Sequence, residues 1–299
     1  MVPGMRVGIT GASGLIGTAL TRHLEASGHE VRPFVRRPAG ATEISWDPGR
    51  GVLDPADLDG LNAVVHLAGA GIGDHRWTDE YKASVLDSRV LGTTLLAKAI
   101  AAGGGPRVLL SASAIGIYGS SEAMVDERSP LGDDFPARVG IAWEASTAAA
   151  EDAGVRVAHL RTGIVLSGQG GALKKMIPLF KFGLGGRFGD GRQWMSWISI
   201  DDEVRAIEHL LDSDVAGPVN LTAPNACRNA DFAKTLGAVL GRPVWLPVPE
   251  FGPKLLLGSE LADSLVFGSQ HVAPTVLLAD GFQFEHPQLE QALRAVLDR

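Results

Sequence analysis

A glycine-rich segment between an apolar run and a helical pattern constrains the fold of this chain more than any other feature. Gly11, Gly14 and Gly17 follow the apolar residues 5–10 and open the helical pattern of residues 15–27. In a G-x-x-G-x-x-G loop the first glycine permits a tight turn, and the second lets a pyrophosphate approach the backbone. The third lets the helix pack closely on the sheet, and N–H groups at the helix N-terminus attract phosphate.

The position of this loop in a strand–turn–helix unit predicts a dinucleotide site. The alternative is a glycine-rich turn that binds nothing. The residues expected to contact the cofactor in this loop are Thr10, Gly11, Ser13, Gly14, Leu15, Ile16 and Gly17.

Short apolar runs alternate with helical patterns in the first half of the chain. This alternation predicts a parallel sheet with helices on both faces, and thus a Rossmann-type doubly wound α/β domain over residues 1–165. The expected strands are residues 5–10, 31–35, 43–46, 63–67, 108–111 and 155–160. The expected helices are residues 15–27, 79–102 and 136–152.

The alternation becomes less regular beyond residue 165. We expect a smaller α+β lid region over residues 166–299, with 249–299 as its final segment, above the sheet edge where such folds bind ligands. The glycine-rich residues 168–171 and 183–191 predict loops. The expected strands are 194–200 and 218–222, and the expected helices are 201–211 and 229–241. The core of the lid is expected to contain Trp194, Trp197 and Trp245.

The residues after the second predicted strand indicate which dinucleotide is bound. A fold of this type that uses NAD(H) usually has an acidic side chain there, on the ribose 2′-hydroxyl. Arg36 and Arg37 stand in its place. Because guanidinium groups pair with a 2′-phosphate and stack on adenine, we predict NADP(H), with Arg36 as the better candidate. The alternative is an exposed basic pair on a loop.

Composition narrows the class of protein further. The 299 residues, 45% hydrophobic and 20% charged, are typical of a globular chain. A net charge of −7 gives no general attraction to nucleic acid or acidic membranes. Cys227 is the single cysteine, which excludes an internal disulfide, argues against a metal site and indicates a reducing compartment. Since we find no signal-peptide pattern and no apolar run of about 18 residues, we expect a cytoplasmic protein without membrane spans.

Several further motifs occur in the order found in a known group. They are Leu67-Ala68-Gly69, Arg76-Trp77-Thr78, Ser88-Arg89-Val90, Ser111-Ala112-Ser113, Tyr118-Gly119, Trp143-Glu144, Arg161-Thr162-Gly163 and the stretch from Trp197 to Asp202. With the glycine loop, they resemble the extended short-chain dehydrogenases/reductases. More narrowly, they are similar to the atypical "epimerase family" within that group, NAD-dependent epimerase/dehydratase-like proteins with a small C-terminal domain.

The resemblance implies further contacts with the cofactor. Leu67, Ala68 and Gly69 would line the ribose and pyrophosphate, Arg89 would face the nicotinamide half, and Val165 would lie near the carboxamide. The alternatives are strand-end packing for the first three and a surface helix charge for Arg89. The resemblance also implies a small-molecule substrate, such as a nucleotide sugar, and a homodimer that pairs helices 79–102 and 136–152.

The catalytic pair of the short-chain enzymes is missing. These enzymes use a tyrosine as acid/base, with a lysine four residues later that lowers its pKa. Tyr81 and Tyr118 are the only tyrosines, and neither is followed by that lysine; Phe135 or Pro136 takes the tyrosine place. Ser113 and Tyr118 remain as catalytic candidates, the alternatives being a strand-end serine and an aromatic ring packed over the pocket.

Three functions stay open on these residues. The first is an NADP(H)-dependent oxidoreductase or epimerase with a non-standard proton donor. The second is an NADP(H)-sensing protein without turnover, and the third is a fold relic that binds no nucleotide. Arg187 and Arg192, in a glycine-rich loop, would hold an anionic group of a substrate or lie in a solvated turn.

Overall fold

The computed structural model describes residues 4–245 and 247–298. Its largest element is a seven-stranded sheet in the order β11-β7-β5-β4-β1-β2-β3, in which every neighbouring pair is parallel. The strands are β1 (Arg6–Thr10), β2 (Glu30–Val35), β3 (Ile44–Ser45), β4 (Ala63–His66), β5 (Val108–Ala114), β7 (Arg156–Thr162) and β11 (Gly217–Leu221). The predicted Rossmann-type α/β fold is thereby confirmed.

The strand order reverses between β1 and β4. From β1 the chain builds outward through β2 and β3, then returns to the other side of β1 with β4 and continues to β5, β7 and β11. Connections that leave in opposite directions open a crevice at the carboxyl ends of the strands. Thr10 pairs with His66, so β1 and β4 end at the same level beside this crevice.

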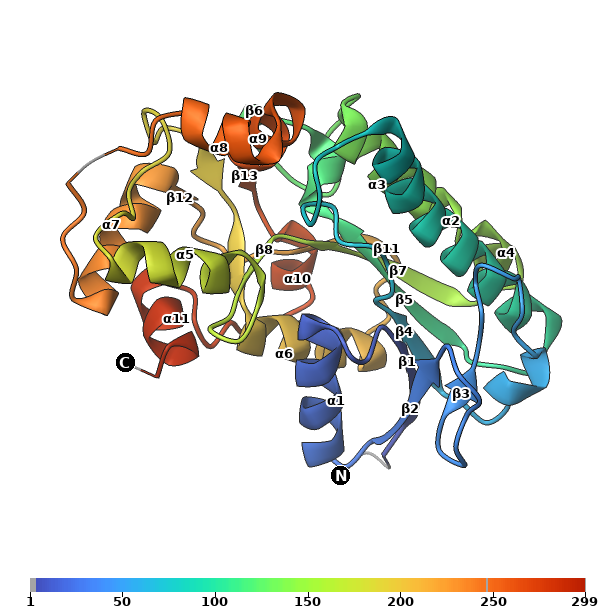
Figure 1. The fold of residues 1–299 in the computed structure, drawn as a ribbon. Coiled ribbons are helices and arrows are strands. Elements are labelled where there is room, and N and C mark those ends of the chain that lie inside the picture. The colour runs from blue at the N-terminus through green and yellow to red at the C-terminus, as the bar shows by residue number, and fades with distance from the viewer. Residues whose placement is uncertain (1–3, 246, 299) are drawn as a thin grey trace.

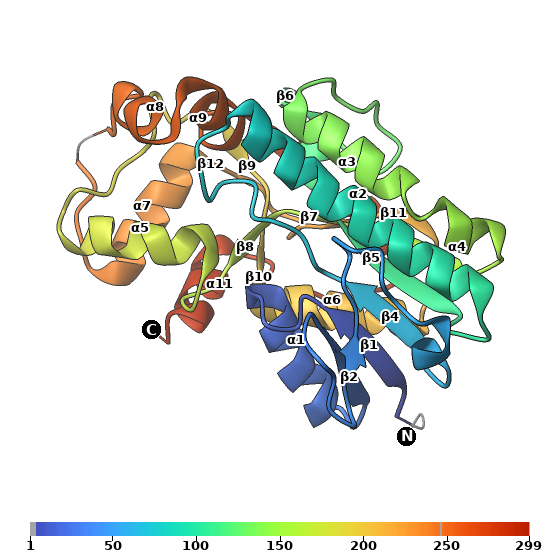
Figure 2. The ribbon, with the colours of Figure 1, turned by 45° about the vertical axis from the view of Figure 1, so that its right-hand side comes forward.

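Helices cover both faces of the sheet (Figures 1 and 2). On one face lie α2 (Asp79–Ala102), α3 (Phe135–Ala145) and α4 (Ala148–Asp152). On the other lie α1 (Leu15–Ala26), α6 (Ile200–Asp212) and α10 (Thr275–Ala279). Leu109 belongs to the apolar core beneath α2, and Leu110 to the core beneath α1 and α6. Since successive strand residues face opposite sides, both faces need apolar residues, as the continuous runs in the sequence predicted.

The single helix predicted over residues 136–152 is wrong, because two helices occupy this segment. α3 ends at Ala145 and α4 begins at Ala148. At the break, the Ser146 hydroxyl donates to the carbonyl of Ala142, and the Thr147 hydroxyl lies 2.7 Å from the carbonyl oxygen of Glu144. Hydroxyl side chains that bond nearby carbonyls compete with regular helix bonding, and Thr147 is buried here against His159.

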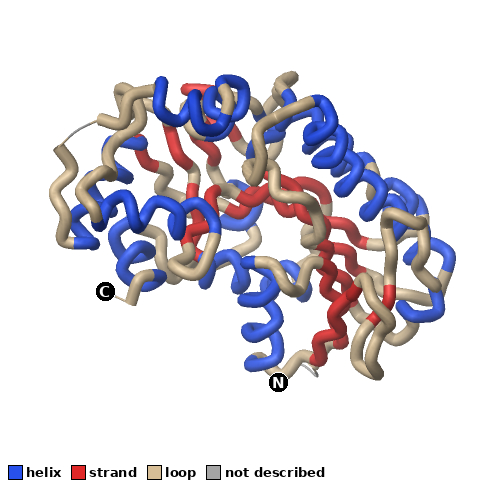
Figure 3. The backbone as a smooth tube through the Cα atoms, viewed as in Figure 1, coloured by secondary structure: helices blue, strands red, loops and turns tan. Residues whose placement is uncertain are grey.

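A smaller lobe lies beyond the carboxyl edge of the sheet, and Figure 3 shows that helices dominate it. Its helices are α5 (Gly171–Lys181), α7 (Asn229–Leu240), α8 (Phe251–Leu257), α9 (Ser259–Leu265) and α11 (Leu289–Val296). Three two-stranded sheets accompany them: β8 (Ile164–Leu166) with β10 (Trp197–Ser199), β9 (Trp194–Met195) with β12 (Cys227–Arg228), and β6 (Ser121–Val125) with β13 (Gln270–Val272).

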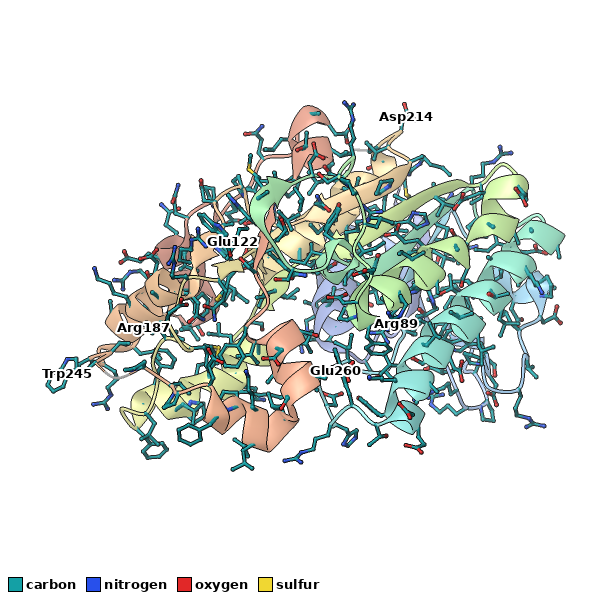
Figure 4. All side chains as sticks on the ribbon, turned by 90° about the horizontal axis from the view of Figure 1, so that it is seen from above. Arg89, Glu122, Arg187, Asp214, Trp245 and Glu260 are labelled. Atoms are coloured by element: carbon teal, nitrogen blue, oxygen red, sulfur yellow. The ribbon has the colours of Figure 1, made fainter. Side chains whose placement is uncertain are left out.

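Parts of the two predicted regions interleave in space. β11, α6 and α10 all follow residue 165, yet they pack within the layers of the large sheet. Trp197 is fully buried in the core of the lobe, as predicted. The same prediction for Trp245 is wrong, because its side chain is 84% exposed at the edge of the molecule (Figure 4). None of the helices in the described part of the chain has the length and apolar character to cross a bilayer.

Substitution of Gly17 tests the close approach of α1 to the glycine loop. A Cβ atom at Gly17 would lie 2.2 Å from the carbonyl oxygen of Gly11, so Gly17→Ala forces the backbone apart. We expect a loss of about 2 kcal/mol or more in the free energy of unfolding, measured by urea denaturation. Gly104→Ala is the control, since a Cβ there meets nothing within 4 Å. Equal stability of the two variants would contradict this packing.

Candidate cofactor site

The glycine loop forms the turn that the sequence predicted. Gly11 has φ of 68°, a left-handed conformation that favours glycine, and its carbonyl accepts a hydrogen bond of 2.9 Å from the N–H of Gly14. A Cβ atom at Gly11 would lie 2.9 Å from the carbonyl carbon of Leu67, so this loop rests against the loop after β4. No described side chain caps α1 at Gly14. The first-turn N–H groups are therefore available to a phosphate.

A buried polar chain fixes the ends of β1 and β4 to each other. The Thr10 hydroxyl oxygen accepts hydrogen bonds from the N–H groups of Leu67 (3.0 Å) and Ala68 (3.2 Å). It also lies 2.7 Å from Nδ1 of His66, whose Nε2 lies 3.0 Å from the hydroxyl of Thr93 on α2. This arrangement sets the backbone of two residues that the sequence assigned to the cofactor site.

The same chain determines the protonation state of His66. Because the Thr10 oxygen already accepts two hydrogen bonds, its own proton is directed at Nδ1, and Nε2 carries the ring proton toward Thr93. A second ring proton would face a hydroxyl with no acceptor capacity left. Burial away from water lowers the pKa of His66 to about 4, so the ring is neutral at physiological pH.

The side chain of Arg89, on α2, is hydrogen-bonded to the loop after β4. Its guanidinium donates to the carbonyls of Ala70 (2.9 Å) and Val85 (3.0 Å), and it lies 4.7 Å from the ring centroid of Trp143. Burial lowers the pKa of Arg89 to about 10, which leaves it charged. The surface-charge alternative for Arg89 is therefore wrong, since only 9% of the residue is exposed. Direct contact with the cofactor stays a prediction.

The two arginines after β2 differ in their surroundings. Arg37 forms a two-fold ion pair with Glu43, with nitrogen–oxygen distances of 2.6 and 2.8 Å, and this raises its pKa. Arg36 is exposed and makes no hydrogen bond to any described residue. A phosphate bound to Arg37 would have to compete with Glu43. The geometry thus favours Arg36 as the group that meets a 2′-phosphate.

Ser113 and Tyr118 lie in a buried polar network at the ends of β5 and β7. Ser113 donates to Glu144 at 2.7 Å, and Glu144 accepts two further bonds of 2.8 Å from Arg161. Arg161 also donates to the Tyr118 hydroxyl, which donates to Asn220 at 2.7 Å. Their catalytic role stays a prediction, but both hydroxyls are already engaged, and burial raises the pKa of Tyr118 despite the Arg161 cation.

Glu144 and Arg161 belong to family motifs for which the sequence indicated no role. Their ion pair is nonetheless the centre of this network, with Arg161 4% exposed. The sequence held one signal, because a buried strand that contains an arginine requires an anionic partner nearby. Only the tertiary structure, which brings Arg161 of β7 to Glu144 of α3, shows which of the 34 acidic residues that partner is.

An aromatic cluster lies at Phe135, one of the two residues expected in the place of the missing catalytic tyrosine. Phe135 packs edge-to-face on Trp77 with 4.8 Å between ring centroids, and the ammonium of Lys82 lies 5.4 Å from the centre of Phe135. Lys82 is itself paired with Glu260 of α9 at 2.6 Å. Figure 4 shows Glu260 beside the start of α2. This ion pair attaches the C-terminal helices to the rim of the crevice.

The segment after β7 forms the opposite rim. Val165 lies in β8, paired with Ile198, and its contact with nicotinamide stays a prediction. A Cβ atom at Gly170 would lie 2.9 Å from the side chain of Leu15, so the start of α5 approaches the glycine loop. The sequence analysis missed α5, since Pro178 and the flanking glycines obscured a helical pattern whose signal was the seven-residue spacing of buried Leu173 and Phe180.

The predicted substrate loop borders a separate cavity of about 440 Å³, whose lining includes Glu122, Phe188, Arg192 and Phe267. Arg187 is exposed, and Figure 4 shows it at the periphery of the lobe. The structure does not bring Arg187 and Arg192 to the glycine loop, and their role as anion ligands stays a prediction.

Acidification tests the neutral state of His66. Its pKa in the folded protein, about 4, lies below the ordinary 6.5, so the stability it confers is complete above pH 6.5 and is lost as pH falls toward 4. We expect wild type to lose about 2 kcal/mol more than His66→Gln between pH 7 and pH 5 in urea unfolding. Parallel curves for the two proteins would show that His66 does not titrate in this window.

Glu203 predicts the opposite pH dependence. Its carboxyl is 1% exposed, Oε1 accepts from the Thr162 hydroxyl at 3.0 Å, and Oε2 has no partner among the described residues. Burial raises its pKa from 4.5 to about 8, so stability falls as pH rises between these values. Glu203→Gln should be more stable than wild type by about 3 kcal/mol at pH 7, and equal near pH 4.5. Exposed Glu25→Gln is the control; a gap that does not depend on pH would refute the burial argument.

Comparison with known proteins agrees with this geometry. Residues 7–222 match the NAD dependent epimerase/dehydratase family, and residues 248–296 match a domain of unknown function, DUF1731. The chain is 43% identical to the epimerase family protein MT2273 of Mycobacterium tuberculosis, over 96% of each chain. It is 39% identical to the epimerase family protein SDR39U1 of Homo sapiens, over 98% of this chain and 100% of the human one.

Solved structures extend the comparison. The human epimerase family protein SDR39U1 (isoform 2), crystallised with NADPH, superimposes with a TM-score of 0.90 at 37% identity, covering 99% of this chain and 100% of that one. A nucleoside-diphosphate sugar epimerase of Corynebacterium glutamicum gives 0.82 at 38% identity, covering 98% and 58%. The chain therefore belongs to the NAD dependent epimerase/dehydratase family and carries the DUF1731 domain at its C-terminal end.

Proposed function

We propose that this protein binds NADP(H) in the crevice between β1 and β4 and uses it as an oxidoreductase or nucleotide-sugar epimerase-like enzyme. The observation that carries the proposal is the pairing of an uncapped helix N-terminus at Gly14 with an exposed Arg36 after β2. The helix N-terminus attracts the pyrophosphate, and the guanidinium of Arg36 attracts a 2′-phosphate. The bound NADPH of the human relative supports it.

The residues at the crevice fit the cofactor in their chemistry. The turn at Gly11 and the N–H groups that follow would hold the pyrophosphate, and Leu67, Ala68 and Gly69 would line the ribose. Arg89 and Val165 would border the nicotinamide half. When bound, the nicotinamide supplies a hydride donor or acceptor, while the chain supplies position and charge.

Proton transfer would need a donor other than a Tyr-x-x-x-Lys pair. Tyr118 and Ser113 are the hydroxyls proposed from the sequence, but their bonds to Arg161 and Glu144 have to open first. This cost favours a second candidate function, an NADP(H)-sensing protein without turnover. Nicotinamide absorbance in stopped flow, with a panel of carbonyl compounds and nucleotide sugars, separates the two. Scattering and mass measurements with and without NADPH test whether the sensor changes shape.

We also propose that the protein is a homodimer in a reducing compartment. A homodimer would pair α2 and α3, on which Leu91 and Ile141 are 51% and 39% exposed. The single cysteine, Cys227, favours a reducing compartment such as the cytoplasm. The substrate would be a small molecule such as a nucleotide sugar.

Replacement of Arg36 tests the cofactor preference. We expect Arg36→Ala to lose about ten- to a hundredfold in affinity for NADPH, the effect of one charge-assisted phosphate contact, with little change for NADH. Calorimetric titration measures both. Arg37→Ala is the matched control and should lose less, because Glu43 already occupies its guanidinium. If Arg36→Ala lost as much affinity for NADH as for NADPH, the predicted preference for NADP(H) would be wrong. If wild type bound neither nucleotide, the proposed function would be wrong.

A further inference from the structure

Two segments of the small lobe expose large apolar side chains. Directly after α5, Phe182 and Leu184 are 82% and 69% exposed. On α8, Phe251, Leu255 and Leu256 are each more than 70% exposed. Single exposed apolar residues are ordinary, but a cluster on a folded chain indicates a contact surface.

A loop between the two helices makes the two segments one surface. Lys175 on α5 lies 3.8 Å from Asp74 in this loop. Arg76, two residues on, donates to the carbonyl oxygens of Leu255 and Leu256 on α8. In Figure 4, α5 and the α8–α9 pair both lie along the lower edge of the molecule. We call this surface, formed by residues 171–187 (α5 and the loop after it), residues 70–78 and α8, the α5–α8 face.

The charge of this face is opposite to that of the chain. Residues 171–187 contain no aspartate or glutamate and four exposed cations, Lys174, Lys175, Lys181 and Arg187, although the net charge is −7. Most of the negative charge therefore lies elsewhere. Because exposed charges are screened beyond about 8 Å at physiological salt, the local sign decides what approaches the face.

We propose that the α5–α8 face docks on an anionic phospholipid membrane. Apolar side chains interspersed with lysines are the pattern of interfacial helices, in which the apolar groups enter the acyl boundary and the cations meet the headgroups. A second copy of the chain is disfavoured, since a two-fold contact centred on α5 would bring its cations together. This inference is independent of the proposed function. It concerns one local surface, whereas the expectation drawn from the net charge concerns the chain as a whole.

Vesicle flotation of the full chain tests the proposal. We expect binding to vesicles of phosphatidylcholine and phosphatidylglycerol, weaker binding at high salt, and none to phosphatidylcholine alone. Phe182→Ser with Leu184→Ser should reduce binding about tenfold or more, through lost apolar insertion. Lys174→Gln with Lys181→Gln should reduce it by a similar factor, through lost headgroup attraction.

A matched variant keeps the test specific. Leu278→Ser with Lys98→Gln replaces one exposed apolar residue and one exposed cation away from the face, and it should bind as wild type does. Absence of binding to anionic vesicles, or equal losses in this control, overturns the proposal. The proposal is also overturned if sedimentation velocity shows a dimer of wild type that the Phe182 and Leu184 substitutions dissociate. The α5–α8 face would then be the contact between two copies of the chain.

Discussion

The hydroxyl of Thr10 is the point on which the crevice depends. It accepts two backbone N–H groups of the loop after β4 and donates to His66, which in turn reaches Thr93 on α2. The glycine loop follows Thr10 directly, so one buried hydroxyl sets the relative position of both walls at the switch point between β1 and β4. Because the side chains of Thr10, His66 and Thr93 are fully buried, an unmade bond among them would cost a desolvation penalty, and their geometry is correspondingly well determined.

Polar groups of the chain divide into those used by the fold and those left for ligands. Glu144, Arg161, Tyr118 and Asn220 satisfy one another beneath α3, and Arg89 satisfies the carbonyls of the β4 loop. Arg36 and the first-turn N–H groups of α1 have no such partners among the described residues. An unpartnered cation after β2 and uncapped N–H groups after the neighbouring β1 are the features that a dinucleotide with an extra phosphate would satisfy.

The small lobe is attached to the crevice by contacts that the order of the chain does not suggest. Lys82 and Glu260 are 178 residues apart, yet they form a 2.6 Å ion pair at the rim. The loop 70–78, which follows β4, contacts two helices of this lobe: Asp74 pairs with Lys175 of α5, and Arg76 donates to the carbonyl of Leu256 on α8.

The sequence alone determined the parallel sheet from β1 to β7, the glycine loop and the presence of a basic rather than an acidic residue after β2. These depend on local patterns: apolar runs with both faces buried, glycine where φ is positive, and residue type at a strand end. Tertiary structure decided the use of each polar group. The residue types could not show that Glu43 pairs with Arg37 and leaves Arg36 exposed, because that pairing depends on the path of the loop between β2 and β3. Nor could they show that Arg161 donates to Tyr118, because these two residues meet only when separate elements pack. The split of helix 136–152 has the same origin, since the Thr147 side chain is buried against His159 of the neighbouring strand.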